Sequence, residues 1–369
     1  MSLDQIILWI VAVGFILGGL DKIFGGKLGL APKFEEGFQA MGTLALGMAG
    51  IICLTPLIGR YLGPVITPFF QAIGVDPGMF GAILANDMGG YDLAMELAVD
   101  ERAGLLSGAI VASMFGVILV FHIPVGLGII PKEKHPWFAQ GLLIGFIVTP
   151  IGSILGGLVA GFPFLFILRN MVPIIVISIL LAIGLRLAPN AMVTGSLWFG
   201  RAVTALIYFG LICAGFEAIT GAVILPGMTP ISEAMSTVGH IALVLAGTFP
   251  VLSILLKVLD KPLKAAGRHM GLDSTSTAGL IFALANSVPV FTMIKDMDRK
   301  GTIINTVWAI TVGAALGDHL GYTAGVRPDM IVPMIVAKLS AGACGVAIVL
   351  IQEHLRNSNV PAASPRIDG

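Results

Sequence analysis

The sequence has few charged residues and no excess of either sign. Asp, Glu, Lys and Arg make up 11% of the 369 residues, whereas a soluble globular domain carries about 25%. The 21 basic and 21 acidic side chains give a net charge of +0, so we expect no nucleic acid or other anionic partner. Apolar residues make up 56% of the chain and gather in long runs. The composition therefore predicts an all-α polytopic protein embedded in a lipid bilayer.

The chain also lacks the residue patterns of common catalytic and metal sites. Its three cysteines, Cys53, Cys213 and Cys344, lie in apolar runs without disulfide or metal-ligand spacing. There is no GxxxxGK[ST] loop for ATP, no HExxH or CxxC pattern and no serine elbow. We therefore expect no enzyme activity, no cofactor and no metal. The first apolar run follows Asp4 rather than a basic segment, which is typical of a retained helix and not of a signal peptide.

Long apolar segments occur throughout the chain. Each is long enough to cross about 30 Å of hydrocarbon as a helix. The sequence predicts nine crossings, at residues 3–20, 37–58, 104–123, 137–160, 170–187, 197–216, 238–257, 302–317 and 330–352.

A sequence repeat covers most of the chain. Residues 34–50 return as residues 231–247, with six of 17 positions identical, and further identical pairs such as His122 and His319 recur in order 197 positions apart. Internal repeats in a hydrophobic chain are typical of transporters, whose substrate site lies between the copies. We predict repeat 1 at 1–160, a linker transmembrane helix at 161–196, repeat 2 at 197–355 and a cytoplasmic tail at 356–369.

Each copy also contains one interrupted apolar segment, at residues 78–98 and 275–297. Gly89 and Gly90 break the first, and Pro289 breaks the second. Each segment is either a broken helix that crosses the membrane or a re-entrant hairpin that returns to the side from which it came.

The distribution of basic residues favours re-entrant hairpins. Of the 21 Lys and Arg residues, Lys338 lies inside a crossing; hairpins place 16 of the others on one side and four on the other, whereas full crossings place ten on each. Basic residues concentrate on the cytoplasmic side of membrane proteins. We therefore predict two inverted-topology repeats of four transmembrane helices plus a hairpin each, with the N-terminus outside, the C-terminus cytoplasmic and the hairpin tips meeting near the midplane.

Polar residues at the hairpin tips are the predicted substrate contacts. Asn86 and Asn286 occupy matching positions, where their amides either line a polar cavity or cap a broken helix. Asp87 is aligned with Ser287. A carboxylate at membrane depth suits an organic cation or a proton, although Asp87 could instead cap the second arm of its hairpin. Tyr91, one turn on, either offers an aromatic face to a cation or simply packs.

Several other polar residues are candidates for gating or coupling. His122 and His319 are matched by the repeat and lie at the ends of equivalent helices, where histidine either switches charge or has an inherited structural role. Asp318 stands where the first copy has Phe121. Lys338, if deep in the membrane, should pair with an acid. Asp21 and Glu217 are also matched, and are either gate acids or solvated residues at the membrane surface.

Two stretches carry a resemblance to a known family. ILANDMGGYDLA at residues 83–94 and FHIPVGLGIIPKEKHPW at 121–137 resemble the ethanolamine utilisation permease family of bacterial inner-membrane proteins, and the likeness runs along the whole chain. The resemblance implies uptake of ethanolamine for cytoplasmic breakdown by ethanolamine ammonia-lyase, chiefly when the amine is protonated. No binding residues are carried over from the family.

These expectations combine into one leading function. The chain is expected to carry ethanolamine by alternating access or facilitated diffusion, with Asp87 binding the ammonium, Asn86 and Asn286 orienting the polar end and Tyr91 forming one wall. One alternative is a proton- or sodium-coupled transporter of another small solute, with Asp318 or the histidines in the coupling path. Another is a membrane sensor that moves nothing. Association into a homo-oligomer stays open.

Overall fold

The structure is a computed structural model that describes residues 1–84 and 90–358, and within these ranges every regular element is a helix. Seven of the described helices are long and apolar enough to cross a membrane. They are α1 (Leu3–Ile23), the continuous α2–α3 (Ala31–Ala72), α9 (His135–Val159), α10 (Phe164–Leu187), α11 (Pro189–Thr220), α12 (Ile231–His269) and α17 (Ile331–Ser358). The prediction of a multi-pass helical membrane protein is confirmed.

Two further helical parts form a bent pair. Residues Glu101–Val111, comprising α6 (Glu101–Leu105) and the π-helical η4 (Leu106–Val111), meet residues Phe115–Ile129 at 43°. The second part comprises α7 (Phe115–Val117), η5 (Ile118–His122) and α8 (Ile123–Ile129). The segment predicted as a straight crossing at 104–123 is therefore helical but bent.

The crossing predicted at 302–317 is wrong as a continuous helix. The chain forms α15 (Arg299–Val312), leaves the helix over residues 313–317 and begins α16 (Asp318–Val326). Ala314 there has φ of 59°, a left-handed conformation that L-residues with a Cβ rarely adopt. The backbone N–H groups of Ala314 and Leu316 donate to carbonyl oxygens in the helix that precedes the second hairpin tip. These long-range hydrogen bonds replace the ones that a continuous helix would make.

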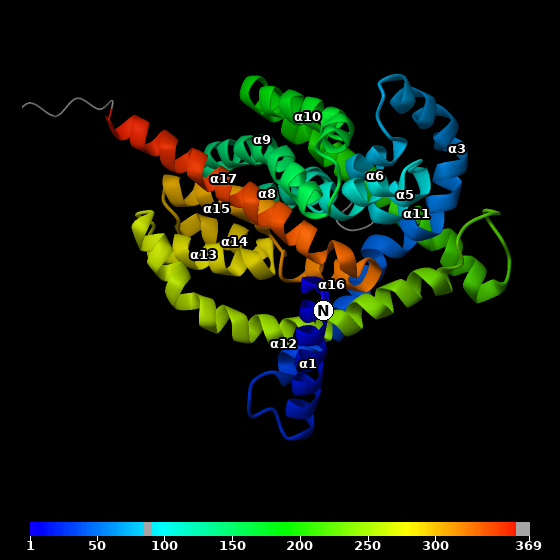
Figure 1. The fold of residues 1–369 in the computed structure, drawn as a ribbon, viewed down its shortest axis with the longest axis horizontal. Helices are drawn as coiled ribbons and strands as arrows, with labels where there is room; N and C mark the ends of the chain where they lie inside the picture. The colour runs from blue at the N-terminus through cyan, green and yellow to red at the C-terminus, as the bar shows by residue number, and fades with distance from the viewer. Residues whose placement is uncertain (85–89, 359–369) are drawn as a thin grey trace, which may run out of the picture.

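Both interrupted segments fold back on themselves. The first contains η2 (Pro77–Phe80), α4 (Gly81–Leu84) and α5 (Gly90–Leu97); the second contains α13 (Ser274–Ala285) and α14 (Ser287–Met293). At the open end of the first, Asp76 accepts hydrogen bonds from the N–H groups of Val99 and Asp100. In the second, a Cβ added to Gly279 within α13 would lie 2.9 Å from Cε of Met297, which follows α14. Each segment is therefore a hairpin. Figure 1 shows α5 in the opposite half of the view from α13 and α14.

The turn before each hairpin is the same in both halves of the chain. Gly74 and Gly271, 197 residues apart, have φ of 73° and 65°. Their N–H groups donate at 2.9 Å to the carbonyl oxygens three residues earlier. Asp76 and Asp273 follow and cap the next helix. Only glycine adopts this backbone conformation without strain, so the same local sequence gives the same turn twice.

Two helix crossings near the centre are also related by the repeat spacing. Gly14 of α1 packs on Gly247 of α12, and Gly210 of α11 packs on Gly50 of α3, such that a Cβ at any of the four would collide with the facing backbone. Gly50 and Gly247 are an identical pair of the sequence repeat. Small residues allow membrane helices this close approach. Figure 1 shows α1 crossing α12, which runs from the loop after α11 to the hairpin that begins with α13.

Candidate functional site

The tip of the second hairpin lies against the helix that carries His122. Nε2 of His122 is 3.1 Å from Oγ of Ser287, and both side chains are buried. The His122 ring also meets the ring of Phe291 edge-on, with centroids 5.9 Å apart. The structure thus brings together two predicted residues, one from each half of the chain. Both His122 and His319 are 3% exposed, so neither lies at a solvated helix end.

Asn286 occupies the break between α13 and α14. Its backbone is extended, and its Oδ1 accepts a hydrogen bond of 2.8 Å from the N–H of Val288, which caps α14. Asn286 is half-buried, and its Nδ2 donates to no residue in the described part of the chain. The amide oxygen therefore has the structural role, while the amide N–H groups are available to a ligand.

The structure describes only part of the tip of the first hairpin. Asn86 and Asp87 lie outside the described residues. Tyr91, at the start of α5, is buried and meets the ring of Tyr322 edge-on with centroids 6.3 Å apart. Tyr322 was not predicted from the sequence. It follows His319 by three residues on α16 and so lies on the same helix face, which is the signal that could have identified it.

The start of α16 carries two further predicted residues. Asp318 is the first residue of α16, and the N–H of His319 donates to the carbonyl of Ala314 at 3.2 Å. The unwound segment before α16 also packs on the second hairpin tip, because a Cβ at Gly313 would lie 3.2 Å from Cβ of Ser287. Asp318 and His319 therefore follow directly on backbone that contacts Ser287.

A buried lysine binds to the bend between η4 and α7. Lys338 of α17 is 0% exposed, and its Nζ donates to the carbonyl oxygen of Ser113 at 2.7 Å. Ser113 lies in the bend between η4 and α7, where helix carbonyls lose their partners. Since a buried ammonium is costly unless it is bonded, a carbonyl released by the bend is a favourable acceptor.

Comparison with known proteins identifies the family. A family profile described as "Ethanolamine utilisation protein, EutH" matches residues 3–351. The chain belongs to this family. The resemblance inferred from residues 83–94 and 121–137 is thereby confirmed. No solved structure is significantly similar to the chain.

Individual relatives of this EutH-family chain cover nearly its whole length. It is 48% identical over 349 residues to the probable ethanolamine permease EutH of Listeria monocytogenes serotype 1/2a (strain 10403S), which covers 94% of both chains. It is 39% identical to the probable ethanolamine permease EutH of Escherichia coli (strain K12), over 96% of this chain and 97% of the relative. The uncharacterized protein YxeR of Bacillus subtilis (strain 168) is 42% identical over 94% of both chains.

Asp21 and Glu217 have different surroundings in this EutH-family chain, although the repeat aligns them. Asp21 is only 4% exposed, so it is not the solvated surface acid that was one expectation. Its carboxylate accepts three backbone hydrogen bonds of 2.8 Å, from Leu28, Leu30 and Ala31, and so fixes the loop between α1 and α2. Glu217 lies near the end of α11, is half-buried, and its carboxylate bonds to no described residue.

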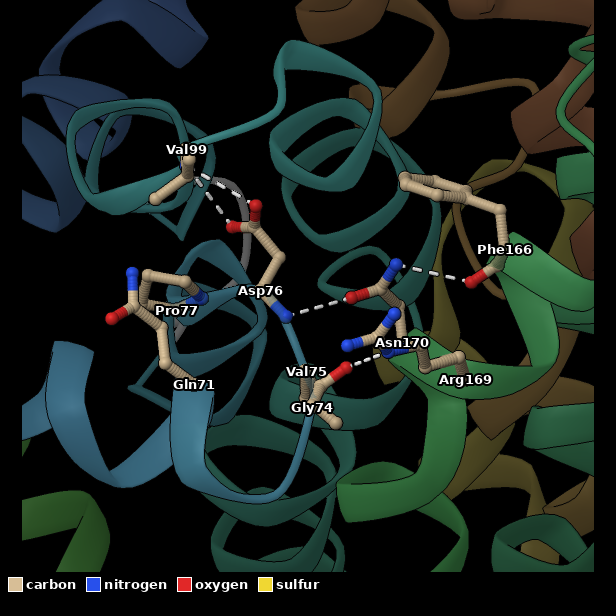
Figure 2. Close-up of a pocket in the computed structure, with 9 residues that line it drawn as sticks. All are labelled: Gln71, Gly74, Val75, Asp76, Pro77, Val99, Phe166, Arg169 and Asn170. Carbon is tan, nitrogen blue, oxygen red and sulfur yellow. Dashed lines mark hydrogen bonds between the residues drawn. The ribbon is translucent and has the colours of Figure 1, made fainter.

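A pocket of about 380 Å³ beside the first hairpin belongs to a structural clamp (Figure 2). Oδ1 of Asn170 in α10 accepts a hydrogen bond of 2.8 Å from the N–H of Asp76, and the guanidinium of Arg169 donates to the carbonyl of Gly74. The carboxylate of Asp76 is already occupied by backbone N–H groups. The charged groups of this pocket therefore anchor α10 to the hairpin, and a substrate would have to displace them.

Metal binding has no support in the described ranges, 1–84 and 90–358. There, no three His, Cys, Asp or Glu side chains are placed so that they could hold one ion together.

Proposed function

We propose that this protein carries ethanolamine across the bacterial cytoplasmic membrane into the cell. The observation that carries the proposal is family membership over residues 3–351, together with relatives at 48% and 39% identity that are named probable ethanolamine permeases. Seven apolar helices of spanning length, and an eighth that is bent, supply the necessary membrane domain. A permease of this kind acts on a small molecule and performs no reaction on it.

The proposed substrate site lies between the two hairpin tips. Ethanolamine carries a positive ammonium at one end and a hydroxyl at the other. In the proposal, Asp87 binds the ammonium, Asn86 and Asn286 orient the hydroxyl end, and Tyr91 forms a wall. The available Nδ2 of Asn286 and the hydroxyl of Ser287 support a polar lining at the second tip.

We further propose that the two halves are inverted repeats, with the N-terminus outside and the C-terminus in the cytoplasm. The paired turns at Gly74 and Gly271 and the paired crossings at Gly50 and Gly247 support a common ancestor for the halves. The sequence counterpart of the His122–Ser287 pair is then His319 with Asp87. Each histidine would then contact the hairpin tip that belongs to the other half of the chain, so its protonation would depend on the position of that tip. A gating or coupling group must respond in this way. Asp318 directly precedes His319, the histidine of the second pair.

The test is uptake of labelled ethanolamine into vesicles that contain only the purified protein. Movement down a gradient without any cation supports a facilitator, and movement that requires a proton or sodium gradient supports a coupled transporter. Saturable binding without movement identifies a sensor and contradicts the proposal. Asp87→Asn should abolish uptake and leave membrane insertion intact. The matched control is Asp296→Asn, at an exposed acid at the end of the second hairpin and away from its tip, which should transport normally.

A further inference from the structure

A cavity of about 390 Å³ lies between α3, α5 and the segment that begins α12. It is separate from the clamp around Asp76 and borders the second arm of the first hairpin. Its lining includes three carboxylates and three hydroxyls, on Asp92, Glu96, Glu233, Thr55, Thr229 and Thr237.

The electrostatics of this cavity favour a cation. No Lys, Arg or His is among its lining residues. Neither Glu96 nor Glu233 forms an ion pair within the described ranges of the chain, and both are exposed. Three carboxylates that border one space without basic partners repel one another. A bound cation would remove this repulsion.

Asp92 carries an oxygen at this cavity whose hydrogen-bonding capacity is unmet. Its side chain is half-buried, and its Oδ2 is enclosed without a hydrogen-bond partner among the residues that the structure describes. Buried carboxylate oxygens are rarely left unbonded, because each unmet hydrogen bond to a charged group costs several kcal/mol. Asp92 needs a donor, and a ligand in the cavity that it lines can supply one.

One backbone carbonyl at the cavity also lacks its helical hydrogen bond. Pro56 of α3 has no N–H, so the carbonyl of Ile52 four residues earlier loses its helical partner. Both residues border the cavity. The next carbonyl, that of Cys53, accepts a hydrogen bond of 3.0 Å from the N–H of Thr229, which ties the segment before α12 to this part of α3.

We propose that this cavity binds a small primary hydroxyalkyl-ammonium ion, as a first site on the way to the hairpin tips. Asp92 and Glu233 provide charge for the ammonium, and the threonine hydroxyls suit the hydroxyl end. A shared divalent metal fits less well, since no described group of three carboxylates converges on one point. Asp92 directly follows Tyr91 on α5, so the helix that borders the cavity also leads to the proposed substrate site.

The substrate named here rests on the proposed function, so the experiment separates the two. Uptake kinetics in protein-only vesicles are measured for the unchanged protein, Asp92→Asn, Glu233→Gln and Glu133→Gln. Glu133 is an exposed acid outside the cavity and serves as the control. Loss of one charged contact, worth about 1.4 kcal/mol, should raise the KM of Asp92→Asn about tenfold at unchanged kcat. Glu233→Gln should change KM in the same direction, and Glu133→Gln should change neither constant.

Direct binding gives a second measurement. Ethanolamine, but not the uncharged analogue ethylene glycol, should raise the unfolding temperature of the Asp87→Asn protein in nanodiscs, and adding Asp92→Asn should remove this shift. An unchanged KM in both cavity variants, or a shift that survives the second substitution, overturns the inference. If the unchanged protein transports nothing, the proposed function fails, and the binding measurement alone decides whether the cavity holds the cation. If Asp92→Asn does not fold, Glu233→Gln takes its place in both measurements.

Discussion

Nε2 of His122 lies 3.1 Å from Oγ of Ser287, so one buried hydrogen bond joins a bent span of the first half to the hairpin tip of the second. Serine can donate to a neutral imidazole and accept from a protonated one. The contact can therefore persist when His122 gains a proton, while the charge beside the tip changes. This property makes the pair suitable for a gate that responds to pH or to substrate.

Removing this hydrogen bond should affect stability and transport together. Ser287→Ala and His122→Ala should each lower the stability of the folded protein, and a double-mutant cycle should show a coupling energy of about 1 kcal/mol. Thermal unfolding of the purified protein gives the energies, and vesicle uptake should fall in both variants. Ser340→Ala is the control, because within the described ranges Ser340 bonds only to carbonyls of its own helix. Strictly additive effects would show that the contact carries no energy.

The central helix crossings lead to a prediction about packing. Gly50→Ala places a methyl group against the carbonyl of Ile207 in α11 and should destabilise the protein by about 1–3 kcal/mol. Gly47→Ala, one turn earlier, meets no atom of the described residues within 4 Å and should be neutral or slightly stabilising, since alanine favours helices. Thermal unfolding in detergent distinguishes the two. Equal stability of both variants would contradict the close crossing.

The repeat relationship extends this prediction to the second half. Gly247→Ala, at the position that matches Gly50, should destabilise to a similar extent, because a Cβ there meets the carbonyl of Val11 in α1. A large loss for one glycine and none for the other would contradict equivalent crossings.

Lys338 should be required for the bent span to keep its shape. Lys338→Met removes the donor to the Ser113 carbonyl and leaves it unbonded in the core, at a cost of about 1–3 kcal/mol. We expect lower thermal stability and reduced uptake. Lys264→Met is the control, because Lys264 forms an exposed pair with Asp260 four residues earlier on its helix. Wild-type stability and uptake in Lys338→Met would show that the bend does not depend on the lysine.

The sequence predicted the membrane helices well, because an apolar segment that faces lipid has few alternatives to a helix. It failed where tertiary contacts decide the backbone. The unwinding before Asp318 depends on hydrogen bonds to α13, some 30 residues away in the sequence. No local sequence pattern predicts the left-handed backbone of Ala314. The same holds at the site: His122 and Ser287 were separate candidates 165 residues apart, and only the fold shows that they touch.

Lys338 and Tyr322 illustrate a second limit. The sequence indicated that a lysine deep in the membrane needs a partner. A backbone carbonyl that a helix bend releases cannot be predicted as that partner until the bend is known. Tyr322 shares a helix face with His319, but that spacing alone did not separate it from an ordinary membrane aromatic, and only the fold places its ring against Tyr91.

Asp21 and Glu217 offer a final test, because the repeat aligns them while the fold gives them different partners. Asp21→Ala removes an acceptor of three backbone hydrogen bonds, and charged hydrogen bonds are worth about 1.5–3 kcal/mol each, so this substitution should clearly lower the unfolding temperature. Glu217→Ala should change it little, since the carboxylate has no partner in the described part of the chain. If Asp21 only fixes the loop before α2, uptake per folded molecule should be unchanged in the Asp21 variant. Transport that is lost while thermal stability is retained would instead assign Asp21 to the gate.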